Sequence, residues 1–315
     1  MPGRLVGVVV LVLGLLATGV LYQNAVVQET SRRGTEINRL AGFFRLDLTN
    51  RIQAYIDTLP GLRAFCQLEE NPNDLQFANY VKLISLQNRY PDLAITFVAR
   101  SVKGKDATAF TEATRRDFSL NPDGHPEFRI KPFGQRDEHL VIRHLYPFVP
   151  ATFGYDLYDP SQAYRSYAEA AITRGEAVAT PPIVLAKDRT VGAKPDTVSV
   201  VVRLPVYRRG TNPQSEEERK AAAWGLVGVG FRILDLVGNI LSAEMLEGMD
   251  LRIVDTQALT AGGTSLIFDT SWMKLSPTEV SKRSATLDTR QPTLSLRVPV
   301  GETASGRSRP SNPGA

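Results

Sequence analysis

Cysteine and histidine are scarce in this chain, which limits the chemistry that it can perform. The single cysteine, Cys66, rules out an internal disulfide and a zinc site built from cysteines. Of the three histidines, His139 and His144 lie five residues apart on a predicted strand, so they face opposite sides and do not share a metal ion. The sequence also has no Walker loop, nucleophile elbow or H-E-x-x-H motif. We therefore expect no metal site, no cofactor and no enzymatic activity.

Clusters of positive charge are also missing. The net charge is +4, but the basic residues are scattered, apart from short pairs such as Arg115–Arg116 and Arg208–Arg209. A protein that binds nucleic acid gathers its Lys and Arg side chains along one face. We interpret the charge as that of a solvated, mixed surface, and we expect no nucleic-acid partner.

The sequence does have a long uncharged run at its start. Residues 5–22 read LVGVVVLVLGLLATGVLY, and the run without charge continues to Gln28. At about 1.5 Å per residue, a helix of this length spans the ~30 Å hydrocarbon core of a bilayer. We predict a cytoplasmic N-terminus at residues 1–4 and a single transmembrane helix at residues 5–27. The alternative is a cleaved signal peptide, whose apolar region is shorter and ends at a small-residue cleavage site.

Residues 28–74 are predicted to form a helical stalk, which Pro60–Gly61 kinks or ends. Apolar residues recur along it at steps of three and four, which is typical of one helix face. This stripe consists of Ile37, Leu40, Phe44, Leu48, Ile52, Tyr55 and Leu59. It fits against the chain's own core or against a second copy, and a long helix next to a membrane favours a homodimer through the stalk.

Helical and strand patterns alternate from residue 73 onward. The predicted helices cover residues 73–89, 105–118 and 161–174. The predicted strands cover residues 93–102, 127–134, 139–149, 177–186 and 197–209. Because strands outnumber helices after residue 90, we predict an α+β fold with mainly antiparallel sheets.

A charged linker at residues 209–221 precedes a second predicted unit. That unit starts with an apolar strand at 224–233 and a helix at 234–245, and it continues with strands at 250–258, 265–270 and 294–300. Residues 301–315 are polar and rich in Gly, Ser and Pro, so they are predicted to be a disordered tail.

The stretch GYDLYDPSQAYR at residues 154–165 gathers tyrosines and aspartates just before a predicted helix. Tyrosine offers apolar contact together with a hydroxyl, and aspartate oxygens can orient a ligand. The same residues can equally form the edge of a core, with an aspartate capping the helix. Composition alone does not decide between these two interpretations.

Four segments in this region resemble, in order, the CHASE domain, the extracytoplasmic sensor of histidine kinases and nucleotide cyclases. They are YPDLAITFVARSV (90–102), FRIKPFGQRDEHLVIRHLYPF (128–148), FGYDLYDPSQAYRSYAEAAITRGEAVATPPIVL (153–185) and VRLPVYR (202–208). They are similar to the family's Tyr-Pro before a strand, its F-x-I-x-P-x-G-x-R-x-E stretch, its G-x-D before a helix and its L-P-V-Y. The resemblance spans roughly residues 75–300.

The resemblance implies two PAS-like modules carried on the stalk, a membrane-distal one at 75–208 and a membrane-proximal one at 209–300. It also implies a sensor that faces the periplasm or the cell exterior and holds its ligand on the distal sheet. The Thr in the A-V-x-T-x-P motif of the plant cytokinin receptors matches Thr180. Their adenine-binding Asp has no acidic counterpart, since the nearest positions are Tyr164 and Arg165, so we do not expect cytokinin recognition.

We expect the ligand on the sheet formed by residues 93–102, 140–148, 178–186 and 198–207. Arg203 would attract an anionic ligand if its side chain faces this site, and strand alternation leaves both directions open. The candidate ligand-binding residues are Phe97, Arg100, Tyr146, Tyr164, Thr180 and Arg203.

The predicted function is that of a membrane-anchored sensor of a small molecule. The family places a second span and an output domain after the sensor, and this sequence ends at Ala315. We expect either a truncated or separated sensor, or a sensor that signals through a partner such as a separate histidine kinase or cyclase. The alternative is a structural or assembly protein of the cell envelope, which a collapsed pocket would reveal. A secreted hydrolase is disfavoured because the sequence pairs no nucleophile with a base.

Overall fold

The computed structural model describes residues 2–69, 71–90, 93–132, 134–159, 164–185, 188, 198–240, 252–254, 266–269 and 294–295. The predicted tail at 301–315 and most of the predicted module at 241–300 lie outside these residues. The side chains of residues 2–10, 12, 26, 29–34, 36, 37, 87, 254, 266, 267, 294 and 295 lie outside the description as well.

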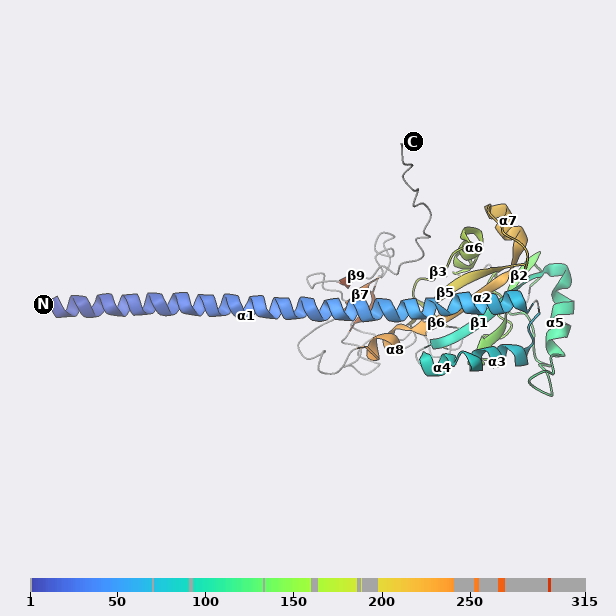
Figure 1. Ribbon diagram of the computed structural model, residues 1–315, viewed down its shortest axis with the longest axis horizontal. Helices are drawn as coiled ribbons and strands as arrows, with labels where there is room; N and C mark the ends of the chain where they lie inside the picture. The colour runs from blue at the N-terminus through green and yellow to red at the C-terminus, as the bar shows by residue number, and fades with distance from the viewer. Residues whose placement is uncertain are drawn as a thin grey trace, which may run out of the picture.

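A long helix forms the first part of the chain. Helix α1 (Pro2–Ile56) extends far from the sheet, and α2 (Thr58–Leu68) continues along it in nearly the same direction (Figure 1). The break falls at Asp57 because the ring of Pro60 would clash with the carbonyl of residue 56 in an unbroken helix. Pro60 is the third residue of α2, where a backbone N–H would have no partner within the helix.

The membrane span predicted at residues 5–27 lies within α1. Within the part of the chain that the structure describes, no helix combines the length and the apolarity that crossing a membrane requires. The structure therefore confirms the long N-terminal helix but does not confirm the predicted span.

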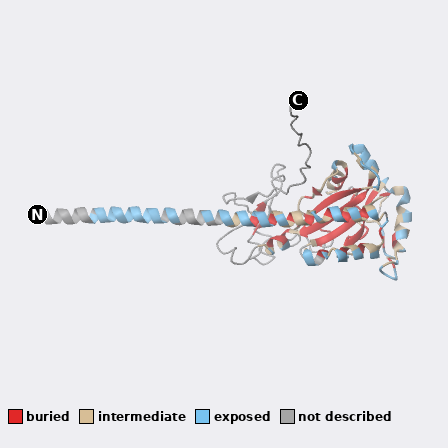
Figure 2. Cartoon of the chain, viewed as in Figure 1, coloured by how far each residue is buried: buried red, intermediate tan, exposed pale blue. Residues whose placement is uncertain are grey.

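The second half of the predicted apolar stripe packs against the chain's own core. Phe44, Leu48, Ile52, Tyr55 and Leu59 are all buried in one cluster, together with residues of the sheet. Figure 2 shows the same change along the helix, which is exposed over much of its length and buried only where it meets the sheet. The homodimer through the stalk stays a prediction.

A short helical pair follows the stalk. Helix α3 (Asp74–Leu83) begins with a capping box, in which the Asn73 side chain accepts the Gln76 N–H and the Gln76 side chain accepts the Asn73 N–H. Helix α4 (Leu86–Arg89) is separated from it by Ser85, whose φ is 51°. The single helix predicted at 73–89 is thus two helices.

The core of the protein is a six-stranded antiparallel sheet with the strand order β2-β1-β6-β5-β3, in which β4 also pairs with β5. Its strands are β1 (Leu93–Lys103), β2 (Glu138–Tyr146), β3 (Val178–Ala179), β4 (Ile183–Val184), β5 (Val198–Tyr207) and β6 (Ala223–Arg232). The helices around it are η1 (Gly104–Asp106), α5 (Ala107–Arg115), α6 (Arg165–Arg174) and α7 (Glu216–Ala222). The antiparallel sheet confirms the α+β fold class.

Three details of the prediction are wrong. The boundary at residue 209 falls inside the sheet, because the charged segment only connects β5 to its neighbour β6 and carries α7. The described part of 127–134, which leaves out residue 133, contains no strand, and Lys131 makes an isolated bridge with Tyr155. The strand at 177–186 is two short strands, because Pro181 and Pro182 have no N–H to donate to a ladder.

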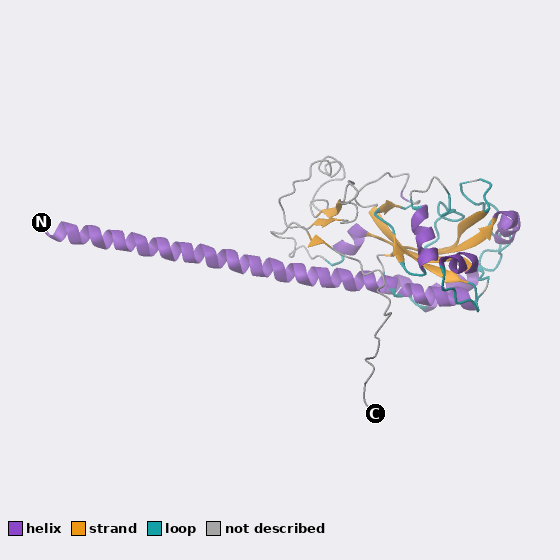
Figure 3. Cartoon of the chain, turned by 90° about the horizontal axis from the view of Figure 1, so that it is seen from above, coloured by secondary structure: helices purple, strands orange, loops and turns teal. Residues whose placement is uncertain are grey.

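The two faces of the sheet are covered differently. One face packs against α1 and α2, and its cluster includes Val98, Val202, Leu204 and Val229. The other face forms a second cluster, which includes Phe97, Val201 and residues of α6 and of the segment before it. We call these the stalk face and the ligand face. Figure 3 shows α1 running along one side of the strands.

A second, smaller sheet lies next to the first. Strand β7 (Arg252–Val254) pairs antiparallel with β8 (Leu266–Asp269) and parallel with β9 (Leu294–Ser295), so a strand lies within each of the predicted ranges 250–258, 265–270 and 294–300. Helix α8 (Ile233–Gly238) follows β6 directly. Ile253 and Phe268 join the same core cluster as the stalk helix.

Candidate functional site

A cavity of about 70 Å³ lies on the ligand face of the six-stranded sheet. Its walls come from the strands and from the segment between β2 and α6, which includes the GYDLYD stretch. Most of the lining is apolar, namely Ile95, Phe97, Ile142, Leu157, Ile183, Val184, Leu185 and Val201. The polar lining residues are Thr152, Tyr155, Tyr164 and Arg203. A concave, mostly apolar site with a few converging polar groups is typical of small-molecule binding.

Arg203 is the only charged residue among the described residues that line this cavity. Its side chain is 4% exposed, and its Nη1 donates a hydrogen bond to the Tyr164 carbonyl oxygen at 3.0 Å. Its buried Nε has no hydrogen-bond partner among the described residues, and none of their carboxylates pairs with it. Burial lowers the pKa of Arg203 to about 10, so the guanidinium remains charged at neutral pH.

The floor beneath Arg203 depends on a glycine. Phe97, Gly228 and Arg203 lie directly opposite one another on β1, β6 and β5, and so share the ligand face. A Cβ atom on Gly228 would come within 2.3 Å of the Phe97 ring. Glycine at this position therefore lets the aromatic ring lie across the middle strand, where it lines the cavity.

Asp156 anchors the wall formed by the GYDLYD stretch. The carboxylate is fully buried, and its Oδ1 accepts the N–H groups of Leu140 and Tyr158 at 2.9 Å. Its Oδ2 lies 3.0 Å from the Arg136 guanidinium and 2.8 Å from Nδ1 of His139. Because the flanking residues Tyr155 and Leu157 line the cavity, Asp156 holds the wall in place while its own oxygens face the protein.

Comparison with protein families identifies the sensor type. The model of the CHASE domain matches residues 70–266, which is more than half of the chain. The chain belongs to the CHASE domain family. The match begins directly after α2 and takes in all six strands of the sheet, so the cavity lies inside it.

Other comparisons add little to this family assignment. The search of curated proteins returns no significant match. One similar solved structure is the ligand-binding domain of the Pseudomonas aeruginosa PAO1 amino acid chemoreceptor PctC in complex with GABA. It shares 11% identity, covers 70% of each chain and has a TM-score of 0.41. A likeness this loose supports no inference about the ligand of this CHASE domain.

The structure brings three of the six predicted ligand-binding residues together. Phe97, Tyr164 and Arg203 all line the cavity. Thr180 does not line it, because its hydroxyl accepts the Val201 N–H at 3.1 Å and so ties the segment between β3 and β4 to β5.

Arg100 and Tyr146 lie on the stalk face. The Arg100 guanidinium is 4.0 Å from the centre of the Trp224 ring, and its Nη1 donates to Asn71 Oδ1 at 2.8 Å. Arg100 lies three positions after Phe97 on β1, so strand alternation alone places the two side chains on opposite faces. Tyr146 turns away because a bulge in β2 at Arg143 shifts the alternation, and Tyr146 then pairs with Thr96.

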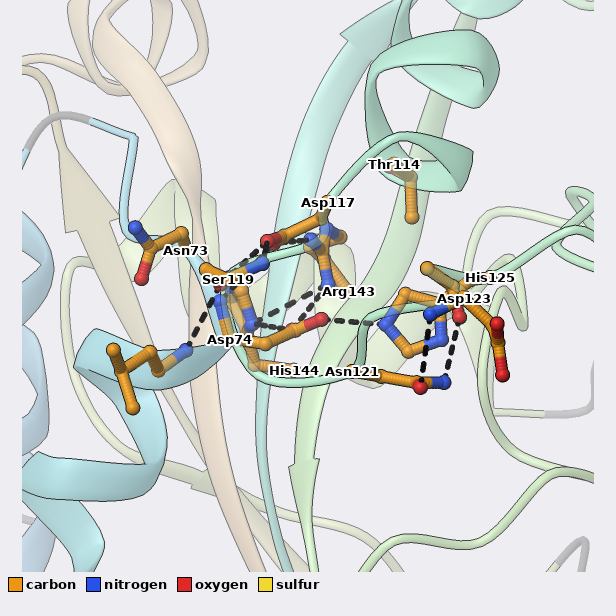
Figure 4. A network of polar contacts seen from close by, with 12 residues as sticks. Asn73, Asp74, Thr114, Asp117, Ser119, Asn121, Asp123, His125, Arg143 and His144 are labelled. Atoms are coloured by element: carbon orange, nitrogen blue, oxygen red, sulfur yellow. Dashed lines mark hydrogen bonds and ion pairs between the residues drawn. The ribbon is translucent and has the colours of Figure 1, made fainter.

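Sequence reasoning missed most of the cavity lining, and also a buried polar network at the distal end (Figure 4). Asp74 is its centre: Arg143 Nη1 donates to its Oδ1 at 2.6 Å, and His144 Nδ1 and His125 Nε2 lie 2.9 Å and 2.6 Å from its oxygens. Arg143 also pairs with Asp117. This network ties the start of α3 to β2 and to the loop after α5.

The network shifts the ionisation of its members. Burial alone would raise the pKa of Asp74, but the hydrogen bond from His144 and the charge of Arg143 outweigh it and hold the pKa well below its usual range. Burial and the nearby Arg143 lower the pKa of His144 in spite of its bond to Asp74. No group of His, Cys, Asp and Glu within the described ranges could hold a metal ion.

Proposed function

We propose that this CHASE domain is a sensor that binds a small molecule in the cavity on its ligand face, without transforming it. Binding there changes how the sheet packs against the α1–α2 stalk. The sensor works outside the cytoplasm, as the family implies, and a separate histidine kinase or nucleotide cyclase reads the change.

The observation that carries this proposal is the alternation along β5. Val201 and Arg203 line the cavity, whereas the intervening Val202 and the next residue, Leu204, lie in the cluster that holds α1 and α2. A shift of this strand that improves contact with a ligand therefore also moves the surface on which the stalk packs. A ligand that binds one of the two arrangements better shifts the population toward it.

The alternative of a ligand-free structural protein predicts that large side chains fill the ligand face. A cavity of about 70 Å³ beside a buried arginine favours the sensor instead.

A thermal-shift screen of the full-length chain against small metabolites tests the proposal. A ligand at 100 times its Kd stabilises the native state by about 2.7 kcal/mol, which raises Tm by several degrees. The matched control is Ile183→Phe, which places a larger side chain in the cavity wall and should abolish the shift. Hydrogen exchange in α2 should also change when the ligand binds. The proposal fails if no compound stabilises the wild type more than it stabilises Ile183→Phe.

A further inference from the structure

Arg203 makes the cavity selective for one kind of ligand. A buried guanidinium without a carboxylate partner is unfavourable, and an anion that reaches it gains the interaction that the protein itself does not supply. Nη1 donates to the Tyr164 carbonyl oxygen, and the buried Nε has no partner among the residues that the structure describes, so its N–H group is left for a ligand. The planar fork of an arginine matches the geometry of a carboxylate or a phosphate. Of these two, the singly charged carboxylate is the less costly to bury beside apolar walls.

The rest of the lining limits the ligand to a single negative charge and no positive charge. None of the described lining residues is acidic, so the ammonium group of an amino acid or an amine would have no ion-pair partner. Asp156, which is the buried acid closest in sequence to the lining, is engaged with Arg136, His139 and two backbone N–H groups. A second carboxylate on the ligand would face apolar walls, and burying it there is costly.

The size and polarity of the cavity define the remainder of the ligand. Benzene occupies an apolar cavity of about 150 Å³. A cavity of about 70 Å³ therefore takes a carboxylate with a tail of only a few carbons. Aliphatic side chains such as Ile95, Ile142 and Leu185 line the same cavity as Arg203, and they suit a hydrocarbon tail.

We infer that the ligand is a short-chain aliphatic monocarboxylate, whose carboxylate pairs with Arg203 and whose tail lies against the aliphatic wall. This inference rests on the proposed function, because it names the ligand class of the same cavity.

Isothermal titration of the full-length chain with three four-carbon probes tests the inference. Butyrate carries only the carboxylate, butyramide replaces it by a neutral amide, and γ-aminobutyrate adds an ammonium group. We expect butyrate to bind at least about 10-fold more tightly than either analogue, since hydrogen bonds to a charged group are worth a factor of roughly 10 to 150. From acetate to butyrate, affinity should rise roughly fourfold per methylene.

Two variants separate the role of Arg203 from a general effect of charge. Arg203→Met keeps a long apolar side chain and removes a buried unpaired charge, so the protein should stay folded. It should lose the preference for butyrate over butyramide. Arg116→Met removes an exposed arginine outside the cavity and should bind butyrate like the wild type.

The outcomes distinguish the inference from the function on which it rests. Butyrate binding that Arg203→Met abolishes, and that Arg116→Met retains, supports the inference. Suppose that a neutral or cationic compound binds to the wild type but not to Ile183→Phe, and that no monocarboxylate binds. The inference is then overturned, and the sensor function stands. If no compound binds in that manner, both are overturned.

Discussion

Replacing Asp156 by alanine should cost a large part of the stability of the sheet. The carboxylate is fully buried and has four partners: two backbone N–H groups, Arg136 and His139. Removing one partner of a buried ion pair costs about 3–5 kcal/mol, and a buried N–H left without an acceptor costs about 1–3 kcal/mol. These costs overlap, and Arg136 keeps its contact with Asp159. We therefore expect a loss of about 3–5 kcal/mol out of a typical 5–15 kcal/mol.

The asparagine variant divides this cost into two parts. Asp156→Asn keeps an oxygen that accepts the two N–H groups but loses the charge, so its loss should be smaller, about 1–3 kcal/mol. Because Tyr155 and Leu157 flank the site, the same variant should weaken ligand binding. The matched control is Asp123→Ala at an exposed position, where we expect a change within about 0.5 kcal/mol.

Urea-induced unfolding measures these differences, with the fluorescence of the buried Trp224 as a probe of the sheet. The expected order of stability is wild type, Asp156→Asn and then Asp156→Ala. The reasoning is refuted if the free energy of unfolding of Asp156→Ala lies within about 1 kcal/mol of the wild-type value, because removing a buried and fully paired carboxylate should be strongly destabilising. Equal losses in both variants would show that the backbone N–H groups contribute nothing.

Three further predictions concern other parts of the sheet. The free energy of unfolding should fall as the pH drops from 7 to 5, because the lowered pKa of His144 means that the unfolded chain binds a proton at this position more readily than the native state does. In His144→Gln, the urea midpoint should therefore depend less steeply on pH. The lowered pKa of Asp74 adds a second loss, which begins only below its unfolded pKa of about 3.9. Gly228→Ala should push the Phe97 ring toward the cavity, costing about 1–3 kcal/mol and weakening ligand affinity in titrations. Leu59→Ala should cost about 2–5 kcal/mol in urea unfolding, because Leu59 is fully buried between stalk and sheet.

The two packing predictions each have a matched control in the chain. Gly42→Ala adds a methyl group to α1, where nothing lies within 4 Å, and should not destabilise the protein. Leu68→Ala shortens a leucine that is 70% exposed and should change the stability by less than about 0.5 kcal/mol. Losses in the control variants as large as those in Gly228→Ala and Leu59→Ala would contradict the packing arguments. An unchanged pH slope in His144→Gln would contradict the linkage argument.

The sequence predicted the elements whose patterns are strong and local. The α+β class, the long N-terminal helix and the strands around Phe97 and Arg203 all follow from periodicity. The place of β6 beside β5 in one sheet does not follow from the sequence, because a charged segment between two strands has the same pattern whether it links two modules or connects neighbouring strands. Only the pairing of β6 with both β1 and β5 decides that question.

In the candidate site, the direction in which a single side chain points was also hard to predict from the sequence. Arg203 and Arg100 both lie on strands of the predicted sheet, and sequence reasoning assigned both to the ligand. Alternation along β1 places Arg100 on the face opposite Phe97, so the sequence alone was enough to separate these two residues. Tyr146 was not predictable in this way, because the bulge at Arg143 reverses the alternation within β2 and depends on how two strands pair.

The stalk and the cavity share one strand, and this sets a condition on any signal that the domain sends. Residues of β5 and β6 form the surface on which α1 and α2 pack, whereas the side chain of Arg203, also on β5, lines the cavity on the ligand face. A ligand that only filled the cavity, with equal affinity for both arrangements of the stalk, would shift nothing. On the function that we propose, an anion that pairs with Arg203 would have a different affinity for each arrangement that moves β5. We therefore expect the charge of the ligand, more than its tail, to shift the population between the two arrangements.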